Sequence, residues 1–137
     1  NVYAVASGVC SGIGYGDNFI AVLISNCIRE LENIVNNIYP NSNKIIDTAY
    51  LGDLLVTSYS QHSRNRRFGV MIGKGYSVKA SQMEMKMIAE GYYATRCIDI
   101  LINKHNINAP IAKAMYHILY EKISPKVEIK ILSDLMS

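Results

Sequence analysis

The sequence predicts an all-α domain, and three observations support this prediction. Apolar residues recur at steps of three and four over several segments, as they do along one face of a helix. Residues that begin or end helices stand between these segments. The one stretch that alternates apolar and polar residues near the end has no neighbouring strand with which to pair. Half of the 137 residues are hydrophobic and 18% are charged, so we expect residues 1–137 to form one domain of about seven or eight helices.

Two helices are predicted in the first part of the chain. Residues 2–13 are apolar and include small residues such as Ala4 and Gly8, which let helices pack closely, so we expect a buried helix there. Asp17 is a good N-cap for a second helix, which Pro40 ends. The apolar residues of this second helix form one wide face: Phe19, Val22, Leu23, Cys27, Leu31, Ile34, Val35 and Ile38.

The second part of the chain returns to the helical period. Ser63 is predicted to cap a short basic helix that runs to Gly73. Helical spacing covers residues 92–106 and 111–122. Pro125 can open a last helix, which we favour over a strand at 127–131. Three alternating methionines indicate an extended segment or an irregular helix end, with packing roles in either case: Met83, Met85 and Met87.

Two glycine-containing segments resemble nucleotide-binding motifs and are rejected. The fingerprint that begins at Gly12 would need its third glycine at position 17, which is Asp17, and no strand precedes it. A helix end followed by a tight turn is the better interpretation. The segment 73–75 resembles the end of a P-loop, but Gly75 stands where Ser or Thr would hold magnesium. The chain therefore carries no complete nucleotide-binding motif.

Composition excludes several classes of function. The formal net charge of +3 permits an anionic ligand but does not indicate a nucleic-acid partner. The sequence offers no membrane span and no zinc-binding spacing of Cys and His. The three cysteines have apolar neighbours in the sequence, so we expect buried, reduced thiols in a cytoplasmic protein: Cys10, Cys27 and Cys97. Because the chain opens with Asn1, we expect residues upstream of it.

The segment around Ser63 is the strongest candidate for chemistry. Ser63 would lead into a helix that begins with Arg64 and Asn65, and a helix start offers free N–H groups and partial positive charge. A guanidinium at that place makes a good phosphate site. Asp53 lies upstream. Because a carboxylate repels phosphate, we expect one near a phosphate site only if it contacts hydroxyl groups or a cation. Two alternatives stay open, a solvated basic helix start and a nucleic-acid contact.

These segments resemble a known family in both order and spacing. The resemblance rests on Gly16-Asp17-Asn18, Leu51-Gly52-Asp53-Leu54, Thr57, Ser63-Arg64-Asn65-Arg66 with Gly69, and Ile88-Ala89-Glu90-Gly91. Over residues 1 to about 121 they are similar to the bacterial-type NAD(P)-dependent glycerol-3-phosphate dehydrogenases. The resemblance implies the helical carboxyl-terminal domain of the 6-phosphogluconate dehydrogenase-like type, which follows a Rossmann domain absent from this chain. It also implies interconversion of sn-glycerol 3-phosphate and dihydroxyacetone phosphate, with NAD or NADP bound mainly by the absent domain.

The resemblance implies roles for individual residues. A general acid/base lysine would directly precede Asn1, with Asn1 and Asp53 supporting it, so this chain alone is expected to be inactive. The implied substrate-binding residues are Ser63, Arg64, Asn65, Asp53 and Thr57, and the implied cofactor contacts are Arg64, Ile88 and Glu90.

The resemblance further implies a cytoplasmic enzyme that supplies phospholipid synthesis, and it leaves a homodimer open. Two rival functions remain, a related reductase on the same architecture and a helical binding module without catalysis.

Overall fold

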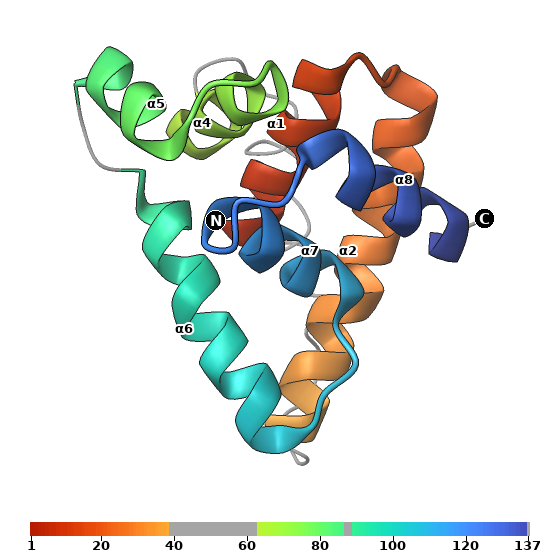
Figure 1. Cartoon of the computed structure of the whole chain (residues 1–137). Helices are drawn as coiled ribbons and strands as arrows, with labels where there is room; N and C mark the ends of the chain where they lie inside the picture. Colours follow the sequence, from red (N-terminus) through yellow and green to blue (C-terminus); the bar gives the residue numbers. More distant parts are fainter. Residues whose placement is uncertain (39–62, 87–88, 137) are drawn as a thin grey trace.

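The computed structural model describes residues 1–38, 63–86 and 89–136, and this part of the chain is helical without strands. Its helices are α1 (Val2–Ile13), α2 (Asp17–Ile38), α4 (Arg64–Gly73), α5 (Val78–Met85), α6 (Glu90–His105), α7 (Pro110–Leu119) and α8 (Pro125–Met136). Figure 1 shows α1 enclosed by the other helices, with α2 and α6 as the two long arms. The prediction of an all-α fold is confirmed for the described residues.

Helix α1 forms the centre of the core. Every residue from Val2 to Cys10 is buried, which agrees with the prediction of a buried helix over residues 2–13. Its closest neighbour is α4, and the two helices meet through glycines. A Cβ on Gly8 would lie 2.0 Å from the Arg66 carbonyl oxygen, and one on Gly69 would lie 2.2 Å from the Val5 carbonyl oxygen. The two backbones are therefore in direct contact, which fixes α4 against α1.

The glycine-rich turn after α1 ends this helix, as predicted. Gly14 adopts φ 118°, and its N–H donates to the Cys10 and Ser11 carbonyl oxygens, while the Tyr15 N–H also donates to Cys10. This left-handed glycine is a common way to end a helix and satisfy its last carbonyl groups. The local geometry is thus a helix end, and no strand precedes it.

A buried carboxylate joins α2 to α7. Glu30 accepts hydrogen bonds from the Ile111 N–H at 2.7 Å, the Ala112 N–H at 2.9 Å and the Tyr3 hydroxyl at 3.0 Å. The residue before α7, Ala109, has no side chain that could cap the helix. Glu30 therefore acts as the N-cap of α7 from a distant part of the chain. Burial raises the Glu30 pKa above its ordinary 4.5, and the three hydrogen bonds oppose that increase.

Several local predictions differ from the structure. Helix α2 begins one residue earlier than expected, so Asp17 is its first residue and the Gly16 carbonyl accepts the Ile20 N–H. Helix α5 was not predicted, because its exposed residues show no apolar period and only Ser81 is buried. Within it, Met83 and Met85 take the helical alternative rather than the extended one.

The last helix and the cysteines give two further outcomes. The prediction of a helix from Pro125 is confirmed, with Ile129 and Leu132 buried. Cys97 is exposed, contrary to the prediction, because it lies on the same side of α6 as the exposed Tyr93 and Ile100. Among the described helices, none is both long and apolar enough to cross a membrane.

Candidate functional site

The start of α4 has the capped geometry that the sequence predicts. Ser63 adopts an extended backbone, and its hydroxyl accepts the Arg66 N–H at 3.2 Å. Arg64 is the first residue of the helix, and its side chain is exposed. The guanidinium group therefore lies beside the end of the helix that carries partial positive charge. This combination can bind an anion such as phosphate.

Asn65 links α4 to two other helix starts. Its Nδ2 donates to Asn1 Oδ1 at 3.1 Å, and its Oδ1 accepts the Gly91 N–H at 2.7 Å. Asn1 in turn donates from Nδ2 to Glu90 Oε2 at 3.5 Å. Asn1 is the N-cap of α1, and Glu90 is the first residue of α6. Residues far apart in the sequence thus bring the positive ends of α1, α4 and α6 together.

Gly91 is required by this arrangement. A Cβ at this position would lie 2.5 Å from Val5 Cγ2, 2.9 Å from Asn65 Oδ1 and 3.0 Å from the Asn1 carbonyl oxygen. Any side chain there would push α6 away from α1 and α4. The Thr95 hydroxyl, one turn further along, donates to the Gly91 carbonyl at 2.7 Å and is fully buried. The first turn of α6 is therefore held firmly in place.

The arginines of α4 have different surroundings. Arg66 is half-buried, and its Nη2 donates to Ser11 Oγ of α1 at 3.2 Å. Arg64 and Arg67 are exposed. Arg66 thus contributes to the contact between α1 and α4, whereas Arg64 is available to a ligand.

The structure brings part of the predicted site together. Asn1, Asn65 and Glu90 are joined by hydrogen bonds, and Ser63 and Arg64 adjoin Asn65 in the chain. Three predicted site residues lie outside the described residues: Asp53, Thr57 and Ile88. Sequence reasoning missed the role of Gly91, although a glycine in the first turn of a helix is a signal of close backbone approach.

The other reactive side chains have structural surroundings. Burial raises the pKa of the Cys10 thiol to about 12 and raises the pKa of the Cys27 thiol well above its ordinary value, so neither is suited to act as a nucleophile. His117 contacts Glu128 closely, and its Nε2 lies 3.7 Å from Glu121 Oε1. In the described parts of the chain, no group of His, Cys, Asp or Glu is arranged to hold a metal ion.

Fold and site together define a helical domain in which three helix starts converge beside an exposed arginine. Residues 1–130 match the family model described as the C-terminus of NAD-dependent glycerol-3-phosphate dehydrogenase. The chain therefore belongs to this family, and the resemblance seen in its motifs is confirmed.

Curated and solved relatives agree with this assignment. The chain is 37% identical over 134 residues to glycerol-3-phosphate dehydrogenase [NAD(P)+] of Staphylococcus aureus (strain JH9), which covers 98% of this chain and 40% of that protein. The crystal structure of glycerol-3-phosphate dehydrogenase from Coxiella burnetii superimposes with a TM-score of 0.91 at 32% identity, over 96% of this chain and 40% of that one. The structure of DsGPDH from Dunaliella salina shares the fold alone, with a TM-score of 0.83 at 18% identity, over 94% of this chain and 24% of that one. The chain thus spans about two-fifths of the length of the curated relatives that it matches.

Proposed function

We propose that this chain is the substrate-binding part of an enzyme that interconverts sn-glycerol 3-phosphate and dihydroxyacetone phosphate with NAD or NADP. The observation that carries the proposal is the meeting of three helix starts around Asn1 and Asn65, with Arg64 exposed beside them. Family membership supplies the reaction, and this geometry supplies a place for the phosphate group of the substrate.

Arg64 is the proposed anchor of the substrate phosphate, with Ser63 beside it. Asn65 has a defined part in this proposal because both polar atoms of its amide are already engaged, one by Asn1 and one by the Gly91 N–H. It therefore holds the helix starts at a fixed spacing and presents the adjoining Arg64. Fixed spacing matters because a misplacement of about 1 Å costs on the order of a hundredfold in rate.

Asn1 is the proposed link between this frame and the proton-transfer group. A general acid/base lysine directly upstream of Asn1 would stand at the start of α1, and the hydrogen bonds of Asn1 to Asn65 and Glu90 would fix its position. Asp53 and Thr57 belong to the same proposal as contacts of the hydroxyl end of the substrate. Ile88 and Glu90, with Arg64, are the proposed cofactor contacts.

The wider setting is part of the same proposal. The nucleotide would be bound mainly by a Rossmann domain elsewhere in the complete protein, and residues 1–137 would form one helical domain. The three cysteines are all unpaired, which is typical of the reducing cytoplasm. A cytoplasmic enzyme that supplies phospholipid synthesis and works as a homodimer completes the proposal.

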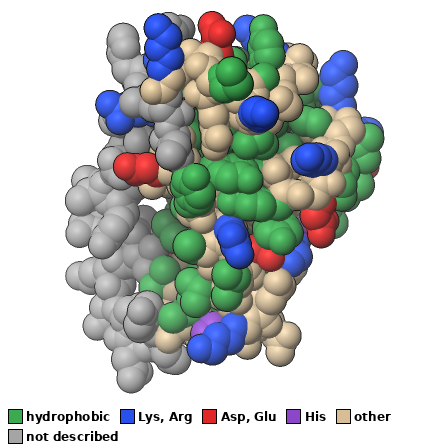
Figure 2. Space-filling view, turned by 60° about the vertical axis from the view of Figure 1, so that its left-hand side comes forward, with side chains coloured by type: hydrophobic (Ala, Val, Ile, Leu, Met, Phe, Trp, Pro, Cys, Tyr) green, Lys and Arg blue, Asp and Glu red, His purple; other side chains and the backbone are tan. Residues whose placement is uncertain are grey.

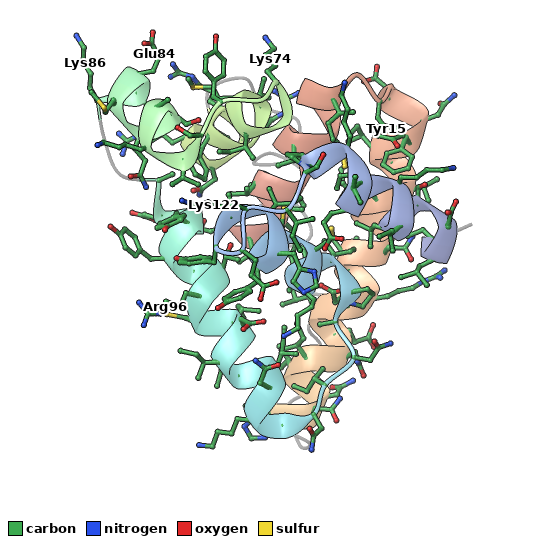
Figure 3. The ribbon with its side chains drawn as sticks, viewed as in Figure 1. Tyr15, Lys74, Glu84, Lys86, Arg96 and Lys122 are labelled. Atoms are coloured by element: carbon green, nitrogen blue, oxygen red, sulfur yellow. The ribbon has the colours of Figure 1, made fainter. Side chains whose placement is uncertain are left out.

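The experiment measures dihydroxyacetone-phosphate-dependent oxidation of NADH and NADPH by the complete protein and by its Arg64→Ala variant. Loss of a charge-assisted contact to phosphate is expected to raise KM about tenfold to a hundredfold. Lys74→Ala is the matched control, because Lys74 is an exposed cation just after the other end of α4 (Figure 3). Its KM is expected to stay within about twofold of wild type.

The outcomes separate the proposal from its rivals. An unchanged KM in Arg64→Ala would remove Arg64 from phosphate binding. A folded complete protein with no turnover on either nucleotide would favour a related reductase or a binding module without catalysis.

A further inference from the structure

A cavity of about 540 Å³ lies outside the site formed by Asn1, Asn65 and Glu90, and it shares no residue with that site. It lies between the α4–α5 turn and α5 on one side and the end of α7 and the start of α8 on the other, with Tyr92 of α6 also contributing. This volume lies within the range of ordinary small-molecule sites. Figure 2 brings the side of α5 and α6 forward. It shows apolar side chains gathered at the centre of this face, with Lys and Arg side chains around them.

Apolar groups form most of the wall of this cavity. Tyr76 and Ile123 are 53% and 37% exposed, which leaves apolar surface open to solvent beside the cavity. Ligand sites are typically lined in this way, with a few polar groups to fix orientation. The remaining apolar lining residues are Ile72, Val78, Tyr92, Ile118, Leu119, Tyr120 and Pro125.

Positive charge lines the same cavity. Lys79 and Lys122 contribute to its wall, and none of the described residues that line it is acidic. Ser77 caps α5 at this wall by accepting the Ala80 N–H at 3.0 Å, so the positive end of α5 also opens here. The electrostatic environment therefore favours one anionic group.

A buried polar atom in the wall has no hydrogen-bond partner. Gln82 lines the cavity, and its Nε2 is buried without an acceptor in the described structure. The nearby Tyr120 hydroxyl is already used, because it donates to the Tyr92 carbonyl at 2.7 Å. Such unsatisfied donors are rare in folded proteins. Because Gln82 Nε2 is buried behind the wall, it offers no contact to a ligand in the cavity.

Lys122 is held in an unusual backbone conformation. Its φ is 56°, in the left-handed region that residues other than glycine rarely adopt. Figure 3 shows Lys122 on the connection between α7 and α8. This connection lies near the start of α6. A lysine at a position suited to glycine places its charge at the cavity at some cost in backbone energy.

We propose that this cavity binds a small anionic amphiphile, meaning an apolar chain or ring that carries one carboxylate or phosphate group. The apolar body would contact Tyr76 and Ile123, and the head group would lie between Lys79 and Lys122. This inference is independent of the function proposed above, because it uses none of the same residues and its test needs no turnover.

The experiment is isothermal titration of the complete protein with decanoate, with decanol and with inorganic phosphate. Decanoate is expected to bind, and decanol and phosphate are expected to bind at least tenfold more weakly, because each lacks one half of the ligand. Lys122→Gly is expected to weaken decanoate binding about twofold to fivefold, since it removes one exposed cation. The same variant is expected to melt no lower than wild type, because glycine adopts φ 56° without strain.

Lys86→Gly is the matched control. Lys86 also has φ 56° and is exposed, but it does not line the cavity. Like Lys122→Gly, this variant loses one positive charge and puts glycine at a position with φ 56°. Its decanoate affinity is expected to equal that of wild type. Equal affinity of the two glycine variants, equal binding of decanol and decanoate, or no decanoate binding to the folded complete protein would each overturn the proposal.

Discussion

Helices α4 and α7 are both ten residues long, yet they are held in place by different physics. Helix α4 is capped by its own Ser63 and lies against α1 with glycine backbones in contact. Helix α7 has no side-chain cap of its own and depends on Glu30 of α2. The contact of α4 with α1 depends on glycines that have no side chains. The contact of α7 with α2 depends on one buried carboxylate, that of Glu30. The glycine contact that places α4 against α1 thus contains no group that titrates, whereas the start of α7 depends on a carboxylate.

The largest effect is expected where the glycine contact is broken. Gly8→Ala places a Cβ 2.0 Å from the Arg66 carbonyl oxygen and 2.9 Å from the Val70 nitrogen, both backbone atoms that cannot rotate away. We expect a loss of about 3 kcal/mol or more in the free energy of unfolding, measured by urea denaturation.

Gly16→Ala is the control for this substitution. Position 16 has nothing within 4 Å of an added Cβ, so we expect a loss below about 1 kcal/mol. Equal losses in the two variants would show that the close approach of α1 and α4 contributes no stability.

The second effect comes from removing the carboxylate that caps α7. Glu30→Ala leaves the Tyr3 hydroxyl and the N–H groups of Ile111 and Ala112 without their acceptor in a buried place. We expect a loss of about 2 kcal/mol, with the start of α7 exchanging amide hydrogens faster while α4 keeps its protection.

Glu32→Ala applies the same substitution two positions later on α2, where the side chain is half-buried, and it should change the unfolding free energy by less than about 0.5 kcal/mol. If hydrogen exchange accelerated equally in α4 and α7 of the Glu30 variant, the two helices would not be held independently.

The smallest effect is a dependence on pH. Because the Glu30 pKa is raised in the folded protein, the folded state holds its proton more tightly than the unfolded state does. The stability from this group is fully present below the ordinary pKa of 4.5 and is lost as pH rises through the raised value. We therefore expect the stability of wild type relative to Glu30→Gln to decline as pH rises above about 4.5. A difference that stayed constant, or grew with pH, would contradict the direction of the shift.

Much of the fold follows from patterns that the sequence displays locally. The apolar period predicted α1, α2, α6 and α7, and a serine before a basic segment predicted the capped start of α4. Helix α8 was predicted from Pro125 and the lack of a pairing strand, because its apolar residues fit a strand as well as a helix. Helix α5 escaped prediction because it is short and its inward face mixes the apolar Val78 and Met85 with the polar Ser81 and Gln82, so no continuous apolar face marks it. Cys97 was placed wrongly because neighbours in sequence lie about 100° apart around a helix, and the apolar residues beside it do not share its face.

The candidate site could be predicted as a set of residue types, but not as a geometry. The serine, arginine and asparagine at the start of α4 indicate an anion site whatever surrounds them. The bond from Asn65 to Asn1 joins residues 64 positions apart, and the contact of Glu30 with Ile111 joins residues 81 positions apart. No local pattern encodes such pairs, because they depend on how whole helices pack.

The glycine contact between α1 and α4 has a consequence for the rate at which the chain folds. Gly8 and Gly69 are separated by about sixty residues, so the chain must close a long loop before their backbones can meet. Contacts of such wide sequence separation slow folding relative to an ordinary helical bundle, in which neighbours along the chain also pack together. We therefore expect α1 and α4 to pair after the local helices have begun to form, and we expect this pairing to limit the rate at which a newly made chain completes its fold.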